Sequence, residues 1–358
     1  MAEREREYAA GLTEAQARAQ SQSGRVVKLN SNENPLGCSP AARIAMAHAT
    51  MQAHRYPPAV AQELNVALAQ RLGVAEECVV TTAGSVQLIE LLLGLTCAGG
   101  RGEALSFAPC FPAFAHRAKI MGVEHRQVPL GSDFGMDLGA LGQAVDERTR
   151  LVYVANPDNP TGRIVSRAEL LDFARSLPKD TLLLVDEAYL DFADDPQAVS
   201  VLGVLDQVPH LGIIRTFSKA YGLAGARVGY GVLPVAIARE LRTMQLPFAV
   251  SGPSIAGALA ALTDEDFRRQ SAELAREGRK YLQQELTRLG CEIVEGQGPF
   301  VMFRPQREAG KVFESLLKQG VAVRPLDYAG LPEWLRVSTG TQEDNEEFVK
   351  ALGVALRE

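Results

Sequence analysis

The sequence predicts an α/β protein in which a mostly parallel sheet, covered by helices, is followed by a smaller α+β domain. Through the middle of the chain, short apolar, β-branched runs alternate with amphipathic segments, which is typical of a parallel sheet. Beyond about Phe248 the pattern changes to a long charged helix and several short strands. The chain has 358 residues, more than a single core usually holds, so two domains are expected.

The individual elements follow from periodicity. Apolar runs predict buried strands at 78–81, 151–154, 182–185 and 211–214. Helical periodicity predicts helices between them at 86–95, 111–121, 167–176 and 235–244. The later region should contain helices at 264–289, 311–319 and 343–356 and strands at 292–294, 301–303, 321–323 and 335–337. We expect an N-terminal arm and part of the small domain at 1–45, the large domain at 46–247, and the small domain at 248–358.

Composition excludes several function classes. The formal charge is 37 − 43 = −6, which disfavours a general role in binding nucleic acid. No apolar run is long enough to cross a bilayer, and the first residues lack a secretory pattern, so no membrane partner is expected. Five cysteines without a close pair favour a reduced, cytoplasmic protein. The five histidines show no metal-ligand spacing, so no metal is expected.

Polar motifs follow three of the predicted strands. Asn159 lies in an Asn-Pro-Thr-Gly turn after the second strand, Asp186 and Tyr189 follow the third, and Thr216 and Lys219 follow the fourth. The carboxyl ends of parallel strands meet at one edge of a sheet, where ligands bind. The sequence therefore predicts a ligand site built from these three segments.

The residue types at this edge indicate their chemistry. Lys219 lies among small and hydroxylated residues, and an amine with a lowered pKa can act as nucleophile and proton carrier. Asp186 ends an apolar strand, where a carboxylate is costly without a partner. Glu187 is the competing carboxylate, although strand alternation directs it to the other face. Taken alone, Asn159 reads as turn chemistry.

Together these motifs resemble the site of aspartate-aminotransferase-type enzymes that use pyridoxal 5′-phosphate (PLP), most closely the histidinol-phosphate aminotransferases. The resemblance runs from about Val27 to the C-terminus. It implies the fold type I of PLP-dependent transferases, with Lys219, Asp186 and Tyr189 as catalytic residues. Lys219 would hold the cofactor through a Schiff base and later carry a proton, and Asp186 would pair with the pyridine nitrogen. Tyr189 and Asn159 would hydrogen-bond the phenolic oxygen.

The resemblance also implies how the cofactor's phosphate and ring are held. It assigns the phosphate to a helix start at Gly84 and Ser85, the hydroxyls of Thr216 and Ser218, and the guanidinium of Arg227. A Gly-Ser pair is also an ordinary helix cap. Val86 departs from the family, where an acidic or amide residue is common, so any contribution of that side chain is absent. Phe111 would stack on the ring, with ordinary core packing as the alternative.

Further residues are assigned to the neighbouring subunit and the substrate. Tyr56 would reach the cofactor phosphate of the partner, which implies a homodimer with a shared active site. The resemblance also assigns Asn32 and Asn159 to substrate binding, although the composition of the Asn32 segment alone is that of a polar turn. Arg324 and Arg336 match arginines that hold the substrate phosphate; the alternative for each is a solvated position on an edge strand. Two arginines suit a doubly charged phosphate, whereas one suffices for a carboxylate.

The resemblance implies transfer of an amino group from L-histidinol phosphate to 2-oxoglutarate. Two other PLP reactions remain open: an aromatic amino acid aminotransferase and a decarboxylase of threonine phosphate. A non-catalytic PLP-binding regulator is the alternative from a different class. No DNA-binding segment accompanies the motifs, and a half-transamination assay would separate an enzyme from a regulator.

Overall fold

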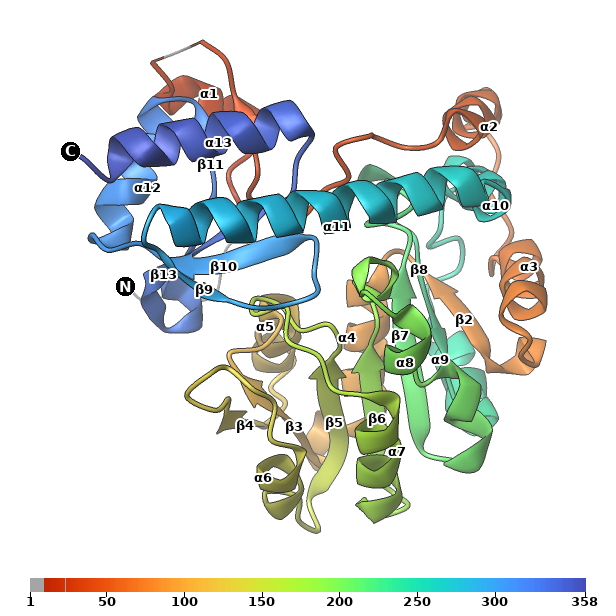
Figure 1. The fold of residues 1–358 in the computed structure, drawn as a ribbon. Helices are drawn as coiled ribbons and strands as arrows, with labels where there is room; N and C mark the ends of the chain where they lie inside the picture. The colour runs from red at the N-terminus through yellow and green to blue at the C-terminus, as the bar shows by residue number, and fades with distance from the viewer. Residues whose placement is uncertain (1–9, 23) are drawn as a thin grey trace.

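A computed structural model of the chain describes residues 10–22 and 24–358 (Figure 1). Residues 1–9 of the expected N-terminal arm lie outside the described residues. The α helices are α1 (Glu14–Gln20), α2 (Pro40–Thr50), α3 (Gln62–Leu72), α4 (Ser85–Thr96), α5 (Pro112–Ile120), α6 (Leu138–Gln143), α7 (Arg167–Ser176), α8 (Pro196–Val199), α9 (Val235–Met244), α10 (Gly252–Thr263), α11 (Glu265–Arg288), α12 (Ala309–Lys318) and α13 (Gln342–Ala355). The strands are β1 (Val27–Lys28), β2 (Val79–Thr82), β3 (Glu103–Ala108), β4 (His125–Pro129), β5 (Thr149–Ala155), β6 (Leu182–Asp186), β7 (Leu211–Thr216), β8 (Gly229–Val232), β9 (Glu292–Val294), β10 (Phe300–Arg304), β11 (Val321–Ala322), β12 (Arg324–Leu326) and β13 (Leu331–Ser338).

The large sheet has seven strands in the order β2-β8-β7-β6-β5-β3-β4. Pairs from β4 through β7 are parallel, and β8 runs antiparallel to both of its neighbours. The predicted α/β class with a mostly parallel sheet is therefore confirmed. All four strands predicted for this region are present, as β2, β5, β6 and β7.

Three strands of this sheet were not predicted, and each lacks an apolar run. The edge strand β4 is polar and partly exposed. Strand β8 contains two glycines, Gly229 and Gly231, whose added β-carbons would meet Ser85 and Leu88 of α4 at 2.3 Å and 2.6 Å. Strand β3 is buried but carries Glu103 and Ser106. These strands are fixed by neighbours distant in sequence, which a local pattern does not show.

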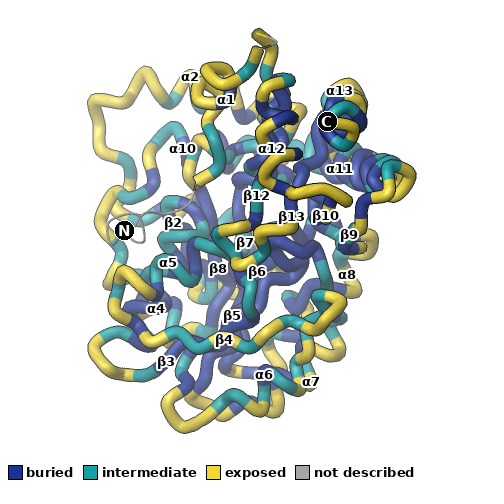
Figure 2. Tube along the Cα trace, turned by 90° about the vertical axis from the view of Figure 1, so that its left-hand side faces the viewer, coloured by how far each residue is buried: buried dark blue, intermediate teal, exposed yellow. Residues whose placement is uncertain are grey.

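Side chains along the central strands alternate between two hydrophobic cores. Val152 and Val154 face the core shared with α3, α7 and α10, whereas Leu151 and Tyr153 face the core shared with α4, α5 and α9. Figure 2 shows these strands as the dark, buried centre of the molecule. Because β6 follows the same alternation, Asp186 lies on the face of Leu182 and Leu184.

The small sheet has four antiparallel strands in the order β12-β13-β10-β9. One face packs against α11, α12 and α13. The opposite face carries Met302 and Trp334, and Trp334 packs edge-on against Phe134 from the loop between β4 and α6, with ring centroids 5.0 Å apart. In Figure 1 the long helix α11 runs above the large sheet and connects two layers: the large sheet with its helices, and the small sheet with its helices.

The domain boundaries remain a proposal. The N-terminal strand β1 pairs with β11, and Val27 and Leu29 join the core of the small sheet. Helix α10, however, packs Ile255 and Ala258 into the core of the large sheet. We therefore propose that the small domain begins after α10 rather than at residue 248.

None of the helices in the described part of the chain is both long and apolar enough to cross a bilayer. Nor do the described residues contain a group of three or more His, Cys, Asp or Glu side chains placed to hold a metal.

Candidate active site

A cavity of about 190 Å³ lies where β5, β6 and β7 end. Larger grooves of about 1270 Å³ and 980 Å³ lie on the outer side of the small sheet and between α6 and α7, and neither contains the predicted motifs. The chemistry of the lining, rather than its size, identifies the site. Nine predicted residues line the cavity: Ser85, Phe111, Asn159, Asp186, Tyr189, Thr216, Ser218, Lys219 and Arg227.

Lys219 reaches the cavity from the loop that follows β7. Its Nζ donates hydrogen bonds to the carbonyl oxygens of Asn32 at 3.1 Å and Ser31 at 3.3 Å. Burial, followed by the positive charge of Arg336, lowers the pKa of Lys219 to about 8. A large fraction of the amine is therefore neutral near pH 8, as a nucleophile or base requires.

Asp186 is held by one donor on each carboxylate oxygen. The Tyr153 hydroxyl donates to Oδ2 at 2.7 Å, and the Ala188 amide donates to Oδ1 at 3.0 Å. Burial raises the pKa of Asp186 to about 6, and these two hydrogen bonds oppose that rise. Sequence reasoning missed Tyr153, because it lies inside an apolar strand; the signal was its place on the same face as Asp186.

Glu187 points to the opposite face, as strand alternation predicted. Its carboxylate accepts from the Ser200 hydroxyl at 3.0 Å, the Val201 amide at 2.8 Å and Arg215 Nε at 2.9 Å. This buried ion pair fully engages the side chain, so Glu187 is not available to the cavity.

The start of α4 forms the anion-binding end of the cavity. Gly84 is the N-cap residue, with φ of 86°, and no side chain caps the helix, whereas Ser166 caps α7. An added β-carbon on Gly84 would lie 2.2 Å from Arg227 Nη2, so only glycine lets the guanidinium approach. Arg227 Nη1 donates to Ser218 Oγ at 3.4 Å. Helix amides, hydroxyls and a guanidinium therefore converge where an anion is favoured.

Asn32, Asn159 and Tyr189 form a polar wall linked to the small sheet. Asn159 Oδ1 accepts from Arg336 Nη1. The Tyr189 hydroxyl accepts from Asn32 Nδ2 at 3.0 Å, and Asn32 Oδ1 accepts from the Ser338 hydroxyl at 2.6 Å. Asn32 was expected to flank the substrate, and the structure brings it next to both Tyr189 and Lys219.

The two predicted arginines lie directly opposite each other on β12 and β13. Residues opposite each other in an antiparallel pair share one face of the sheet. Arg336 is 5% exposed, its buried Nε has no hydrogen-bond partner among the residues that the structure describes, and its guanidinium lies 5.1 Å from the Phe300 ring centroid. Arg324 stacks on Tyr328 at 4.5 Å. Among the described residues Arg336 forms no ion pair, so a buried positive charge remains beside Asn159.

Tyr56 is the one predicted cofactor residue that the single chain places away from the cavity. It is 84% exposed, and its ring lies against Phe248 with centroids 4.7 Å apart. Val86, the departure from the expected pattern, lines the cavity with Phe111.

Comparison with known proteins agrees with this geometry. Residues 24–352 match the family described as aminotransferase class I and II. The chain belongs to the class I and II aminotransferase family. The histidinol-phosphate aminotransferase of Nitratidesulfovibrio vulgaris (strain Hildenborough) is 42% identical over 96% of this chain and 92% of its own length. That of Oleidesulfovibrio alaskensis is 41% identical over 98% and 92%.

A solved structure of another protein has the same architecture as this aminotransferase-family chain. The histidinol-phosphate aminotransferase of Sinorhizobium meliloti, crystallised in complex with pyridoxal 5′-phosphate, superposes with a TM-score of 0.90 at 27% identity. The match covers 97% of this chain and 95% of that one. The predicted fold type is therefore confirmed over nearly the whole chain.

Proposed function

We propose that this chain is a PLP-dependent aminotransferase that moves the amino group of L-histidinol phosphate to 2-oxoglutarate. The products would be imidazole acetol phosphate and glutamate, in histidine biosynthesis. The observation that carries the proposal is the opposed pair of Arg324 and Arg336, with a buried, unpartnered Nε on Arg336. Two guanidinium groups suit a doubly charged phosphate. The relatives named histidinol-phosphate aminotransferases support the same donor.

The lining of the cavity fits PLP at three separate points. The uncapped start of α4, with Arg227 and Ser218, would hold the phosphate. Asp186 would face the pyridine nitrogen, because its carboxylate is buried and faces the cavity without a cationic partner within ion-pair distance among the described residues. Lys219 would bind the cofactor's carbonyl carbon through its amine.

The chain's own residues then account for amino transfer. When bound, PLP supplies an electron sink for the electron pair left at the donor's α-carbon. Once the donor's amine has displaced Lys219 from the cofactor, the freed Lys219 amine would remove the proton from that carbon, and its lowered pKa makes the neutral form available. Asp186 stays anionic above about pH 6 and would stabilise positive charge on the pyridine nitrogen. Asn159, bonded to Arg336, and Tyr189, bonded to Asn32, would hydrogen-bond the cofactor's phenolic oxygen.

Side chains of the small sheet would orient the donor. Arg336 would hold one end of the donor's anionic group from beside Asn159, with Arg324 as its companion. Holding that group in place positions the α-carbon near Lys219, which lowers the entropic part of the barrier.

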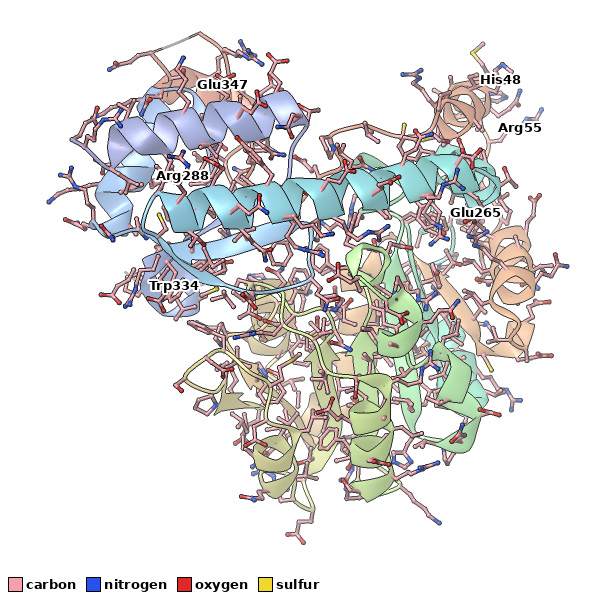
Figure 3. All side chains as sticks on the ribbon, in the orientation of Figure 1. His48, Arg55, Glu265, Arg288, Trp334 and Glu347 are labelled. Atoms are coloured by element: carbon pink, nitrogen blue, oxygen red, sulfur yellow. The ribbon has the colours of Figure 1, made fainter. Side chains whose placement is uncertain are left out.

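We further propose a homodimer in which Tyr56 completes the partner's site. Tyr56 and Phe248 form an exposed aromatic pair, and Met51 and Leu246, 76% and 70% exposed, are also large apolar side chains on the surface. Large exposed apolar side chains of this kind are common at subunit interfaces. Figure 3 shows His48, on α2, and Arg55, beyond the end of that helix, on the side of the molecule away from both sheets. A second copy of the chain is the proposed occupant.

The five cysteines are all free in the described residues. Free thiols persist in a reducing compartment, which supports our proposal that the enzyme works in the cytoplasm.

Purified enzyme assayed with three donors tests the proposed reaction. With 2-oxoglutarate as acceptor, histidinol phosphate should give a kcat/KM at least about tenfold above that of phenylalanine, because only the phosphate engages both arginines. Threonine phosphate should release no carbon dioxide. Preference for phenylalanine would assign the chain to the aromatic aminotransferases, and release of carbon dioxide would assign it to the decarboxylases.

A further inference from the structure

The two layers of the molecule touch, backbone to backbone, at a pair of glycines. An added β-carbon on Gly296 would lie 2.6 Å from both Gly162 Cα and the Thr161 carbonyl oxygen. Real β-carbons do not approach so closely. Next to this contact the Gln297 amide donates to the Gly162 carbonyl oxygen at 2.6 Å.

Side chains extend this contact beyond the two glycines. Gln297 Oε1 accepts from the Asp194 amide at 2.9 Å. Arg279, on α11 and 2% exposed, donates to the Phe192 carbonyl oxygen at 2.9 Å and pairs with the Asp194 carboxylate at 2.5 Å. We call Gly296 and Gln297, with the Gly162 backbone they contact, the glycine clasp.

Gly296 and Gln297 contact the same turn from which Asn159 lines the cavity. This turn, 159–162, is braced by Asp158, whose Oδ2 accepts from the Thr161 hydroxyl at 2.6 Å and the Thr161 amide at 3.3 Å. One end of the turn accepts a hydrogen bond from Arg336 through Asn159, and the other end accepts from Gln297. Because Asp158 braces the turn, we expect a displacement at its Gly162 end to move Asn159 as well.

Gly296 and Gln297 lie on the same side of this contact as Arg336, in and next to the small sheet. Arg336 lies on β13, which pairs with β10 through Met302. Strand β10 begins at Phe300, three positions after Gln297. The small sheet therefore holds the 159–162 turn at two points, one inside the cavity and one outside it.

We propose that Gly296 and Gln297 are positioning residues: the clasp sets the distance between the small sheet and the 159–162 turn, and so places Arg336 against Asn159 and the donor's anionic group. The identity of that donor rests on the proposed function; the positioning does not. An alanine at 296 would need the backbones to separate by about 1 Å to reach ordinary contact, and misplacement on that scale can cost about a hundredfold.

Gly296→Ala tests the clasp, with Gly310→Ala as the matched control. Gly310 lies on α12 in the same layer, and its added β-carbon meets nothing within 4 Å. Neither glycine has a positive φ, so neither alanine is strained by its own backbone conformation. The two variants therefore differ in the interlayer contact.

The fluorescence of Trp334 gives a readout that needs neither cofactor nor donor. Trp334 is the single tryptophan of the chain, and it packs against Phe134 of the other layer. Figure 3 marks it at the lower edge of the small sheet in that view. Gly296→Ala should shift the emission maximum, and Gly310→Ala should leave it at the wild-type wavelength. Gln297→Ala, which removes only the side-chain bond to Asp194, should give a smaller shift in the same direction.

Donor kinetics supply the second readout. For Gly296→Ala we expect the KM for histidinol phosphate to rise about ten- to a hundredfold, because Arg336 would be displaced from the donor's anionic group. Wild-type emission and wild-type KM in folded Gly296→Ala would overturn the proposal. If that variant does not fold, wild-type values for Gln297→Ala would overturn it. A wild-type enzyme that ignores histidinol phosphate refutes the proposed function alone, because the shift in Trp334 emission still decides on the clasp.

Discussion

Replacing Tyr153 with phenylalanine should make the stability of the cofactor-free protein depend more strongly on pH through Asp186. The substitution keeps the ring, which stacks on Phe114 with centroids 4.2 Å apart, and removes the hydroxyl that donates to Asp186 Oδ2. Burial and the neighbouring Asp186 raise the pKa of Tyr153 well above its usual range, so the tyrosine remains the donor at every pH considered.

The loss of unfolding free energy in Tyr153→Phe depends on whether Asp186 is protonated. A hydrogen bond to a charged group is worth about 1.5–3 kcal/mol and one between neutral groups about 1 kcal/mol. Losing the hydroxyl should therefore cost about 1 kcal/mol of unfolding free energy at pH 5 and about 1.5–3 kcal/mol at pH 8.5. The difference corresponds to a pKa of Asp186 about 1 higher in the variant, at ~1.36 kcal/mol for each pH decade.

The direction of this pH dependence follows from proton binding by Asp186. The folded-state pKa of Asp186, about 6, lies above its ordinary value. The folded state therefore binds this proton more tightly than the unfolded state, and the associated stability is lost as pH rises through about 6. Tyr153→Phe extends that loss to higher pH, so the gap between the two proteins widens from pH 5 to pH 8.5.

Urea denaturation of the cofactor-free proteins across this pH range measures the gap. Tyr230→Phe is the matched control, because Tyr230 is equally buried in the same sheet but lies near Arg215, which keeps its charge throughout. The unfolding free energy lost in Tyr230→Phe should not change with pH. If the cost of Tyr153→Phe were the same at pH 5 and pH 8.5, the hydroxyl would not be what supports the Asp186 anion.

Four further predictions concern activity. Lys219→Ala should lower kcat by at least about a thousandfold with an unchanged circular dichroism spectrum, since one amine serves several steps; normal turnover would reject it as the catalytic lysine. Asp186→Asn should lose about 4 kcal/mol of transition-state stabilisation, or about a thousandfold in rate, and a rate within a fewfold of wild type would contradict its role. Inactive Tyr56→Ala and Lys219→Ala chains should regain activity when their subunits exchange, and a silent mixture that demonstrably exchanges would exclude a shared site. Arg324→Ala should lower kcat/KM about ten- to a hundredfold for histidinol phosphate and much less for phenylalanine, so equal losses would refute the phosphate clamp.

The centre of the large sheet could be predicted from the sequence because its strands are buried on both faces. Strands β5, β6 and β7 read as apolar runs, and the polar motifs directly after them mark the edge at which the site lies. Helix α7 begins and ends where its periodicity predicted, and in the structure a capping box at Ser166 fixes its start. Strands β4 and β8 carry polar residues and glycine, and only pairing with distant strands explains them.

The site, too, contains residues that the sequence predicted and residues that it did not. Asp186 and Lys219 were predictable because each follows a strand in a motif of the right type. Tyr153 was not, because a tyrosine in an apolar strand shows its partner only once β5 and β6 are in register. The contact between Gly162 and Gly296 joins segments far apart in sequence, and no local pattern records such an approach. The position of Tyr56 beside a partner subunit stays a prediction.

The central claim, amino transfer from a phosphorylated donor at Lys219, is tested most directly by a single-turnover experiment. PLP-loaded enzyme is mixed with histidinol phosphate or phenylalanine without acceptor, and the absorbance of the bound cofactor is followed. We expect one full absorbance change with histidinol phosphate, at least about tenfold faster at equal low donor concentration than with phenylalanine, and no release of the oxo product from Lys219→Ala. No change with histidinol phosphate in the wild type, or a faster change with phenylalanine, would contradict it.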